Sequence, residues 1–186
     1  MIITELETER LLLRKWKNSD LMPFAELNAD SKVMEFLPKK LTQKESNDLA
    51  SKLIELMQKR GWGIWAVEIK EKNSFIGFVG LHEPTYDFHF TPCVEVAWRL
   101  SKESWGKGYA TEAAKKCLAF AFRNSNIKEI YSFTSTVNLK SEAVMKRLGM
   151  ENLHENFKHP ALPENHKLSE HILYKITKDD WLKIEQ

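Results

Sequence analysis

The residues best suited to chemistry lie in one glycine-rich stretch, residues 104–114, with the sequence SWGKGYATEAA. Gly106, Gly108 and Ala110 fall within five residues, after a run typical of a strand and before a run with helical spacing. Such a loop directs successive backbone N–H groups toward one point at the positive end of a helix, where phosphate oxygens bind. A larger side chain would hold a diphosphate away from these donors. We therefore expect a diphosphate-bearing ligand here.

Two well-known phosphate-binding motifs fit this stretch poorly. A P-loop requires Lys and then Ser or Thr after its second glycine, whereas Gly108 is followed by Tyr109. A dinucleotide fingerprint needs a third small residue where Thr111 stands, and it belongs near the first strand–helix unit of the chain. The remaining pattern is a polar residue, two variable residues, Gly, one variable residue, and then Gly or Ala. Residues 105–110 match it except at the first place, which is Trp105.

The elements that must position this loop follow from hydrophobic periodicity and helix-capping signals. We predict strands over residues 11–15, 64–69, 75–81, 93–100, 130–136, 151–157 and 169–176, and helices that open near residues 19–20, at 42–45, at 110 and at 138. This order predicts an α+β fold with a central mixed, mostly antiparallel sheet flanked by about four helices. A chain of 186 residues is expected to form one domain, residues 1–186.

The glycine loop resembles the acetyl-coenzyme A loop of the GNAT superfamily of N-acetyltransferases, and the element order is that of the GNAT fold. Residues 8–14, 76–81 and 138–150 also resemble the branch of ribosomal-protein N-terminal acetyltransferases, in which Trp at position 105 is common. The resemblance implies acetyl-coenzyme A as co-substrate and direct transfer of an acetyl group to a primary amine. A protein N-terminal α-amino group is favoured, and a small-molecule amine is the other candidate.

The same resemblance implies which residues hold the co-substrate: positions in the strand before the loop, the loop itself and the start of the late helix. They are Val96, Ala97, Trp98, Trp105, Gly106, Lys107, Gly108, Tyr109, Ala110, Thr111, Asn138 and Ser141. Asn138 is explained equally well as a helix N-cap. Ala97 stands where the branch often has glycine, so the strand bulge expected there should be mild.

Three side chains are candidates for proton transfer. Glu95 lies in an apolar predicted strand, where burial would raise its pKa to a value suited to a base. Strand alternation alone instead predicts that Glu95 lies on a solvated face. His82 ends the preceding strand and either faces the same cleft or lies on the surface. Many members of the superfamily protonate the departing thiolate with a tyrosine where this chain has Met145, and the resemblance puts forward Ser141 as the substitute.

Met145 also keeps a second function open, a non-catalytic acyl-coenzyme A-binding sensor or interaction module. On the acceptor side of the cleft, the candidates are Tyr86, Phe88, His159 and His166. The alternative for the aromatic residues is that they cover the sheet edge. The late histidines lack the tight pairing of zinc sites, so we expect no metal.

The composition of the chain disfavours some classes of partner. A formal net charge of +2 without a basic stripe does not favour nucleic acid. No apolar run reaches membrane-spanning length and no signal-peptide core is present, so we expect a cytoplasmic protein without a membrane partner. Cys93 and Cys117 lie in apolar runs and are expected to be reduced thiols. We expect a monomer or a homodimer.

Overall fold

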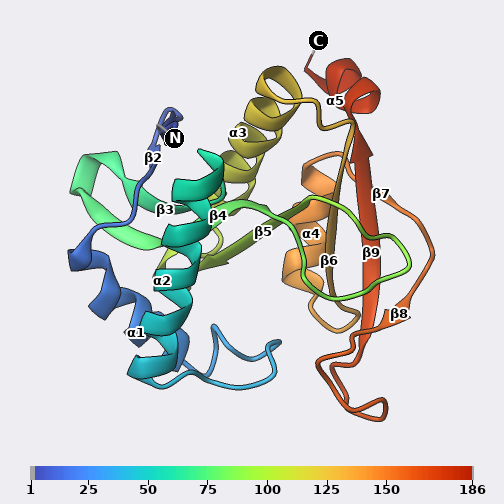
Figure 1. The fold of residues 1–186 in the computed structure, drawn as a ribbon, viewed down its shortest axis with the longest axis horizontal. Coiled ribbons are helices and arrows are strands. Elements are labelled where there is room, and N and C mark those ends of the chain that lie inside the picture. The colour runs from blue at the N-terminus through green and yellow to red at the C-terminus, as the bar shows by residue number, and fades with distance from the viewer. Residues whose placement is uncertain (1–2, 186) are drawn as a thin grey trace.

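One sheet runs through the whole of the computed structural model, which describes residues 3–185 (Figure 1). Its path is β1-β2-β3-β4-β5-β6-β9-β7, with β8 paired to β9. The strands are β1 (Leu6–Glu7), β2 (Leu11–Arg14), β3 (Ile64–Ile69), β4 (Ser74–His82), β5 (Glu95–Leu100), β6 (Glu129–Ser135), β7 (Glu151–Asn152), β8 (Phe157–Lys158) and β9 (Glu170–Thr177). Within the described residues every pairing is antiparallel except that of β5 with β6. The predicted α+β class is confirmed.

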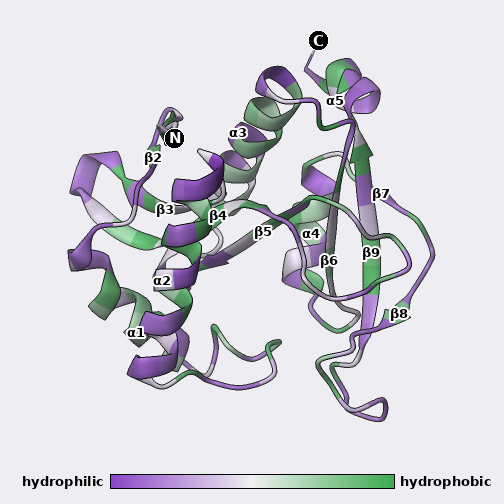
Figure 2. Ribbon diagram, viewed as in Figure 1, coloured by the Kyte–Doolittle hydropathy of each residue, from purple (hydrophilic) through white to green (hydrophobic). Residues whose placement is uncertain are grey.

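Helices cover both faces of the sheet. They are α1 (Leu21–Ala29), α2 (Gln43–Arg60), α3 (Tyr109–Asn124), α4 (Leu139–Arg147) and α5 (Lys178–Ile184). Neighbouring residues of β4 show the two faces, because Phe78 packs with Phe24 of α1 while Val79 belongs to the core that includes Leu118 of α3. Figure 2 shows hydrophobic and hydrophilic residues alternating along α2 and α3, as expected of helices with one face on a core.

The boundaries of α2 follow directly from its sequence. The hydroxyl of Thr42 accepts a hydrogen bond from the backbone N–H of Glu45, and the Glu45 carboxylate accepts one from the N–H of Thr42 at 2.8 Å. This capping box satisfies two of the backbone donors that a helix start leaves free. At the other end Gly61 has a φ of 79°, a left-handed conformation that favours glycine. The predicted start and end of this helix are confirmed.

Other boundaries differ from the prediction. β5 begins at Glu95 rather than at residue 93. The strand predicted over residues 151–157 is two short strands, β7 and β8, because His154 between them has a φ of 56° that a strand cannot contain. β1 and α5 were not predicted. α5 does carry a capping signal, since the hydroxyl of Thr177 accepts a hydrogen bond from the N–H of Asp180 at 3.2 Å.

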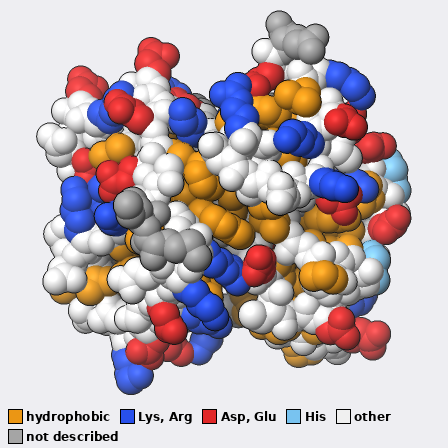
Figure 3. Space-filling model, turned by 45° about the horizontal axis from the view of Figure 1, so that its top comes forward, with side chains coloured by type: hydrophobic (Ala, Val, Ile, Leu, Met, Phe, Trp, Pro, Cys, Tyr) orange, Lys and Arg blue, Asp and Glu red, His pale blue; other side chains and the backbone are white. Residues whose placement is uncertain are grey.

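The feature that positions the site is the joint between β5 and β6. The two strands are in register at one residue pair, Glu95 with Tyr131, whereas β5 pairs with β4 along its whole length and β6 with β9 along its whole length. Beyond that pair β5 and β6 diverge, so the sheet opens into a V (Figure 1). Figure 3 shows the molecule divided into two halves on one face, with apolar side chains visible in the hollow between them.

Among the described residues, no helix combines the length and the apolar character needed to cross a bilayer.

Candidate active site

The edge of β5 that faces the opening carries backbone groups that β6 does not pair. Two hydrogen bonds identify this edge: Tyr131 N–H donates to the carbonyl of Val94 at 2.9 Å, and Ser132 Oγ donates to the carbonyl of Val96 at 3.1 Å. Alternate residues of a strand direct their backbone groups to the same side. The N–H of Val96 points to this side but is paired in the bridge between Glu95 and Tyr131, so the N–H of Trp98 is the donor that points into the opening. The register of β5 against β4 is continuous, so the bulge expected at Ala97 does not form.

The glycine loop lies at the end of this open edge and leads into α3. Gly106 and Gly108 have φ values of 73° and 80°, which an L side chain rarely adopts. A Cβ at Gly106 would meet nothing within 4 Å, so the space above the loop is open. The first backbone N–H that bonds back into the helix start is that of Glu112, to Gly108 at 3.0 Å. The free donors of the first turn, at Tyr109, Ala110 and Thr111, fit the phosphate oxygens of coenzyme A.

Side chains around the loop hold it against its neighbours. Trp105 Nε1 donates to the carbonyl of Leu100 at 2.9 Å, and the ammonium of Lys140 lies 4.3 Å from the centre of the Trp105 ring. This second contact joins the first turn of α4 to the loop. Lys107 is exposed at the centre of the loop, and Tyr109 carries the guanidinium of Arg10 over its ring at 4.7 Å. Trp105 and Tyr109 thus anchor the loop at its two ends.

The first turn of α4 contains Asn138 and Ser141 in direct contact. Asn138 caps the helix, because its Oδ1 accepts from the Ser141 N–H at 3.3 Å. Its Nδ2 lies 3.0 Å from Thr134 Oγ1 and donates to Ser141 Oγ at 3.1 Å. Since the hydroxyl of Ser141 accepts from Asn138, its own proton is free to be donated elsewhere. Met145, one turn later, is buried in the core and contributes no polar group.

Glu95 and His82 lie side by side on the sheet face that α1 and α2 cover. They are partners in the register of β5 and β4, so their side chains point to the same face. Glu95 is partly buried rather than fully solvated, and burial of its carboxyl group raises its pKa to about 8. Burial also lowers the pKa of His82, and the positive charges of Arg60 and Lys52 act in the same direction. The site therefore holds a carboxyl group with a raised pKa beside a neutral imidazole.

Three of the four residues predicted on the acceptor side come together. The ring of Tyr86 lies 5.1 Å from that of His159 and 5.9 Å from that of Phe88, and Phe88 lies 5.5 Å from His159. Burial, reinforced by the neighbouring His171, lowers the pKa of His159 to about 4, so this ring is neutral. The fourth residue, His166, instead closes a local turn, in which its Nδ1 accepts from the N–H of Leu168 at 3.2 Å.

The loop that carries these aromatic residues packs on the sheet through a larger ring cluster. Phe90 stacks on Tyr131 of β6 at 5.4 Å, and Phe88 contacts Phe133 and Phe157 at 5.2 Å each. Phe88 is buried, as expected if it covers the sheet, whereas Tyr86 is 46% exposed at the rim. The sequence analysis missed the contribution of residues 133, 157 and 171, because the contacts join segments far apart in the chain.

A second side chain that the sequence analysis missed is Arg99, which lies on the same face of β5 as Glu95. A single arginine in a strand is expected to face solvent, so nothing in the sequence placed Arg99 in the site. Its guanidinium instead packs against α1, where Nη1 donates to Asn28 Oδ1 at 2.6 Å.

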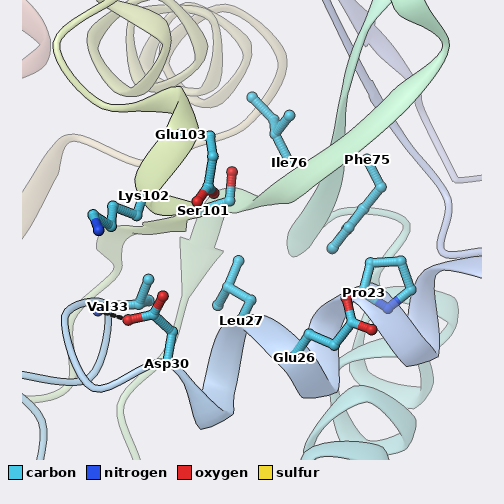
Figure 4. Close-up of a pocket in the computed structure, with 10 residues that line it drawn as sticks. All are labelled: Pro23, Glu26, Leu27, Asp30, Val33, Phe75, Ile76, Ser101, Lys102 and Glu103. Atoms are coloured by element: carbon cyan, nitrogen blue, oxygen red, sulfur yellow. Dashed lines mark hydrogen bonds between the residues drawn. The ribbon is translucent and has the colours of Figure 1, made fainter.

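A cavity of about 420 Å³ lies between α1 and the end of β5 (Figure 4). Leu27 and Phe75 form its apolar floor, and Asp30 on its rim bonds to the N–H of Val33. It contains none of the predicted site residues, so we assign it no role in the chemistry. Among the described residues, no group of three or more His, Cys, Asp or Glu is placed to hold a metal ion.

This chain is similar in sequence to a known family of enzymes. The family model described as acetyltransferase (GNAT) domain matches residues 10–151. The uncharacterized N-acetyltransferase YnaD of Bacillus subtilis is 26% identical over 176 residues, which cover 95% of this chain and 98% of that protein.

Two solved structures share the fold. The ribosomal-protein-S5-alanine acetyltransferase from Vibrio fischeri superimposes with a TM-score of 0.74 at 23% identity, covering 96% of this chain and 98% of the other. The spermidine N-acetyltransferase from Vibrio cholerae, solved with CoA and spermine, has a TM-score of 0.74 at 21% identity and covers 94% and 99%. The acceptors in these two titles are a protein and a polyamine, so the shared fold leaves the acceptor of this chain undecided.

Proposed function

The chain belongs to the acetyltransferase (GNAT) domain family and so transfers an acetyl group from acetyl-coenzyme A to an amine; we propose that the amine is the α-amino group of a protein or peptide, with Glu95 as the base. Family membership sets aside the alternative of a non-catalytic sensor. One observation carries the proposal: a carboxyl group whose pKa burial raises to about 8, next to the open edge of β5.

The pKa of the acceptor ammonium supports the proposal that the acceptor is an α-amino group. An α-ammonium has a pKa near ~8, whereas that of a lysine side chain is ~10.4. A base with a pKa of about 8 takes the proton of an α-ammonium at almost no cost in free energy. Taking it from lysine would cost roughly 3 kcal/mol more. The protein-N-terminus branch suggested by the sequence is consistent with this match.

Each bond change in the transfer has a candidate group. One proton of the ammonium passes to Glu95, the amine nitrogen bonds to the thioester carbonyl carbon, and the C–S bond breaks. The nitrogen then releases a second proton, which replaces the one that the thiolate takes from its donor. The N–H group of Trp98 at the open edge is the donor for the carbonyl oxygen, and one such donor is typically worth ~3 kcal/mol. The thiolate takes a proton from Ser141, whose hydroxyl proton is free, or from water.

The thiols of this chain favour direct transfer over a covalent enzyme intermediate. Burial, with Glu95 and Glu129 acting in the same direction, raises the pKa of Cys93 to about 12, and burial raises that of Cys117 further. Thiols in this state are poor nucleophiles near neutral pH. On the acceptor side, we propose that Tyr86 and His159 border the bound peptide, because Tyr86 is exposed at the rim of the aromatic cluster and its ring contacts that of the half-buried His159.

The test compares Glu95→Gln with the wild type, using thiol release from acetyl-coenzyme A. The acceptors are a peptide with a free N-terminus and no lysine, and a peptide with a blocked N-terminus and one lysine. We expect the wild type to prefer the first peptide. We expect the variant to lose about 10²-fold in kcat, as for loss of a general base, with an unchanged Kd for acetyl-coenzyme A.

The pH dependence sharpens the test. Glu95 must be ionised to act as a base, so kcat of the wild type should rise as the pH increases through about 8, and this rise should be absent in Glu95→Gln. The matched control is Glu103→Gln, an exposed carboxylate just after β5, which should leave kcat unchanged. A preference for the lysine peptide, or an unchanged kcat in Glu95→Gln, would overturn the proposal.

A further inference from the structure

Arg99 lies on the face of β5 that also carries Glu95, the proposed base for the acceptor. Side chains alternate along a strand, so Glu95, Ala97 and Arg99 share one face. The register places Arg99 opposite Phe78 of β4, and Phe78 belongs to the core under α1 and α2. The backbone edge that faces the co-substrate opening is separate from this face. Arg99 and Glu95 therefore belong to the same wall, about 13 Å apart along the strand by Cα.

Two helices hold the Arg99 guanidinium in place. Arg99 Nη1 donates to Asn28 Oδ1 at 2.6 Å, and Asn28 Nδ2 donates in turn to Ser46 Oγ of α2 at 2.8 Å. Asn28 and Ser46 are both fully buried. The guanidinium carbon also lies 5.3 Å from the centre of the Phe78 ring. The fork of Arg99 is thus fixed by neutral groups, and most of its five N–H donors remain available.

The charge of Arg99 has no counter-charge among the described residues. Arg14, which is buried, shows the usual arrangement: it bonds to both oxygens of Asp20 at 2.7 and 2.9 Å and to Glu68 at 2.7 Å. Arg99 forms no ion pair with any residue that the structure describes. Burial accordingly lowers the pKa of Arg99 to about 10. A partly buried cation without a charged partner is less well solvated than one in water, and a bound anion would compensate for this loss.

We infer that Arg99 binds a carboxylate of the acceptor, so that the preferred substrate is an amine that carries an acidic group several bonds from its reacting nitrogen. The planar fork of arginine suits a carboxylate, with which it forms two parallel hydrogen bonds. The separation of Glu95 and Arg99 along the strand suits an acidic side chain in the first two residues of a peptide better than the adjacent carboxylate of a free α-amino acid.

A phosphate of the co-substrate is the competing anion, and the placement of Arg99 argues against it. The phosphate-binding N–H groups are at Gly108 and the first turn of α3, and α3 packs on the opposite face of the sheet from α1. The experiment separates the two anions, because only a role with the phosphates would change the affinity for coenzyme A.

The test uses two peptides that are identical except for Glu or Gln at the second position. With acetyl-coenzyme A saturating, we expect kcat/KM of the wild type to favour the acidic peptide about tenfold, mainly through KM. Arg99→Gln should reduce this ratio to about one and leave kcat/KM for the neutral peptide and the Kd for coenzyme A nearly unchanged. Equal losses for both peptides, or weaker coenzyme A binding, would overturn the inference.

A second variant distinguishes recognition from a purely structural role. Asn28→Asp keeps the shape of the Arg99 partner but places a carboxylate against the guanidinium. If Arg99 only ties α1 to the sheet, this ion pair should preserve the peptide preference. If Arg99 binds the acceptor, the preference should fall as far as in Arg99→Gln, although the cation is still present.

The inference depends on the proposed function, and its failure can be told apart from failure of that function. Calorimetric binding of the two N-acetylated peptides, with coenzyme A present, requires no turnover. Tighter binding of the acidic product by the wild type but not by Arg99→Gln would support the role of Arg99 even if Glu95 is not the base. Equal binding of both products by the wild type would refute it even if the enzyme acetylates peptides.

Discussion

β5 uses its edge and its face in different ways. In the proposed function, its edge and the glycine loop meet the co-substrate through backbone N–H donors, at Trp98 and in the first turn of α3. Its face would meet the acceptor through the side chains of Glu95 and Arg99. Backbone donors survive most substitutions, whereas a carboxyl or guanidinium group does not. The co-substrate region can therefore stay constant while the acceptor region changes.

The largest effect is expected at the glycine loop, where backbone N–H groups are proposed to bind the co-substrate. Gly108→Val should weaken coenzyme A binding about 100-fold, because a β-branched residue cannot hold a φ of 80° and the N–H donors of the helix start would turn away. The measurement is calorimetric Kd. Gly61→Val is the matched control, since Gly61 has a φ of 79° at the far end of α2; it should cost stability without changing Kd. Similar losses in both variants would mean that the loop geometry is not what binds the ligand.

On the face of β5, the carboxyl group of Glu95 should reduce the stability of the folded protein. The pKa of Glu95 is about 8 in the folded state and 4.5 as the ordinary value, so between these values the unfolded chain has lost a proton that the folded chain keeps. The free energy of unfolding should therefore fall as pH rises from 4.5 to 8. Glu95→Gln should be more stable than the wild type at pH 8.5 and about equally stable at pH 4.5, in urea titrations. An equal difference at both pH values would contradict the buried carboxyl.

The smallest effect should come from Ser141, which lies between the two regions at the start of α4. Ser141→Ala should lower kcat about tenfold, because water replaces the hydroxyl as proton donor, with Kd for coenzyme A almost unchanged. Ser125→Ala is the control, because that hydroxyl donates to the carbonyl of Ala121 at 2.6 Å at the end of α3. If both serine variants keep full kcat, the thiolate leaves without help from Ser141.

Sequence reasoning was most successful where the information is local. The capping box at Thr42, the glycine at position 61 and the spacing of the glycine loop each determine structure within a few residues, and α2 and the start of α3 lie where they were predicted. The strand predicted over residues 151–157 was wrong in its middle, because the left-handed turn at His154 has no strong signal in its neighbours.

The face of β5 that carries Glu95 and Arg99 was the hardest part to predict, because its contacts join segments far apart in the chain. The pairing of His82 with Glu95, and of Arg99 with Asn28, depends on which strands and helices pack together. Glu95 and His82 could each be proposed singly, Glu95 because a carboxylate in an apolar run is unusual. Arg99 could not, because its partial burial depends on Asn28 of α1, which lies 71 residues earlier in the chain.

The narrow joint between β5 and β6 has a mechanical consequence. Every other long neighbour pair in the described sheet is held along whole strands, whereas this joint depends on the few hydrogen bonds around Tyr131 and Ser132. It is the line along which the sheet can flex at the least cost in broken bonds. A ligand in the opening would contact both halves of the sheet and hold them together. Entry of the acyl donor and escape of its thiol product would then be accompanied by bending of the sheet itself, without a separate lid.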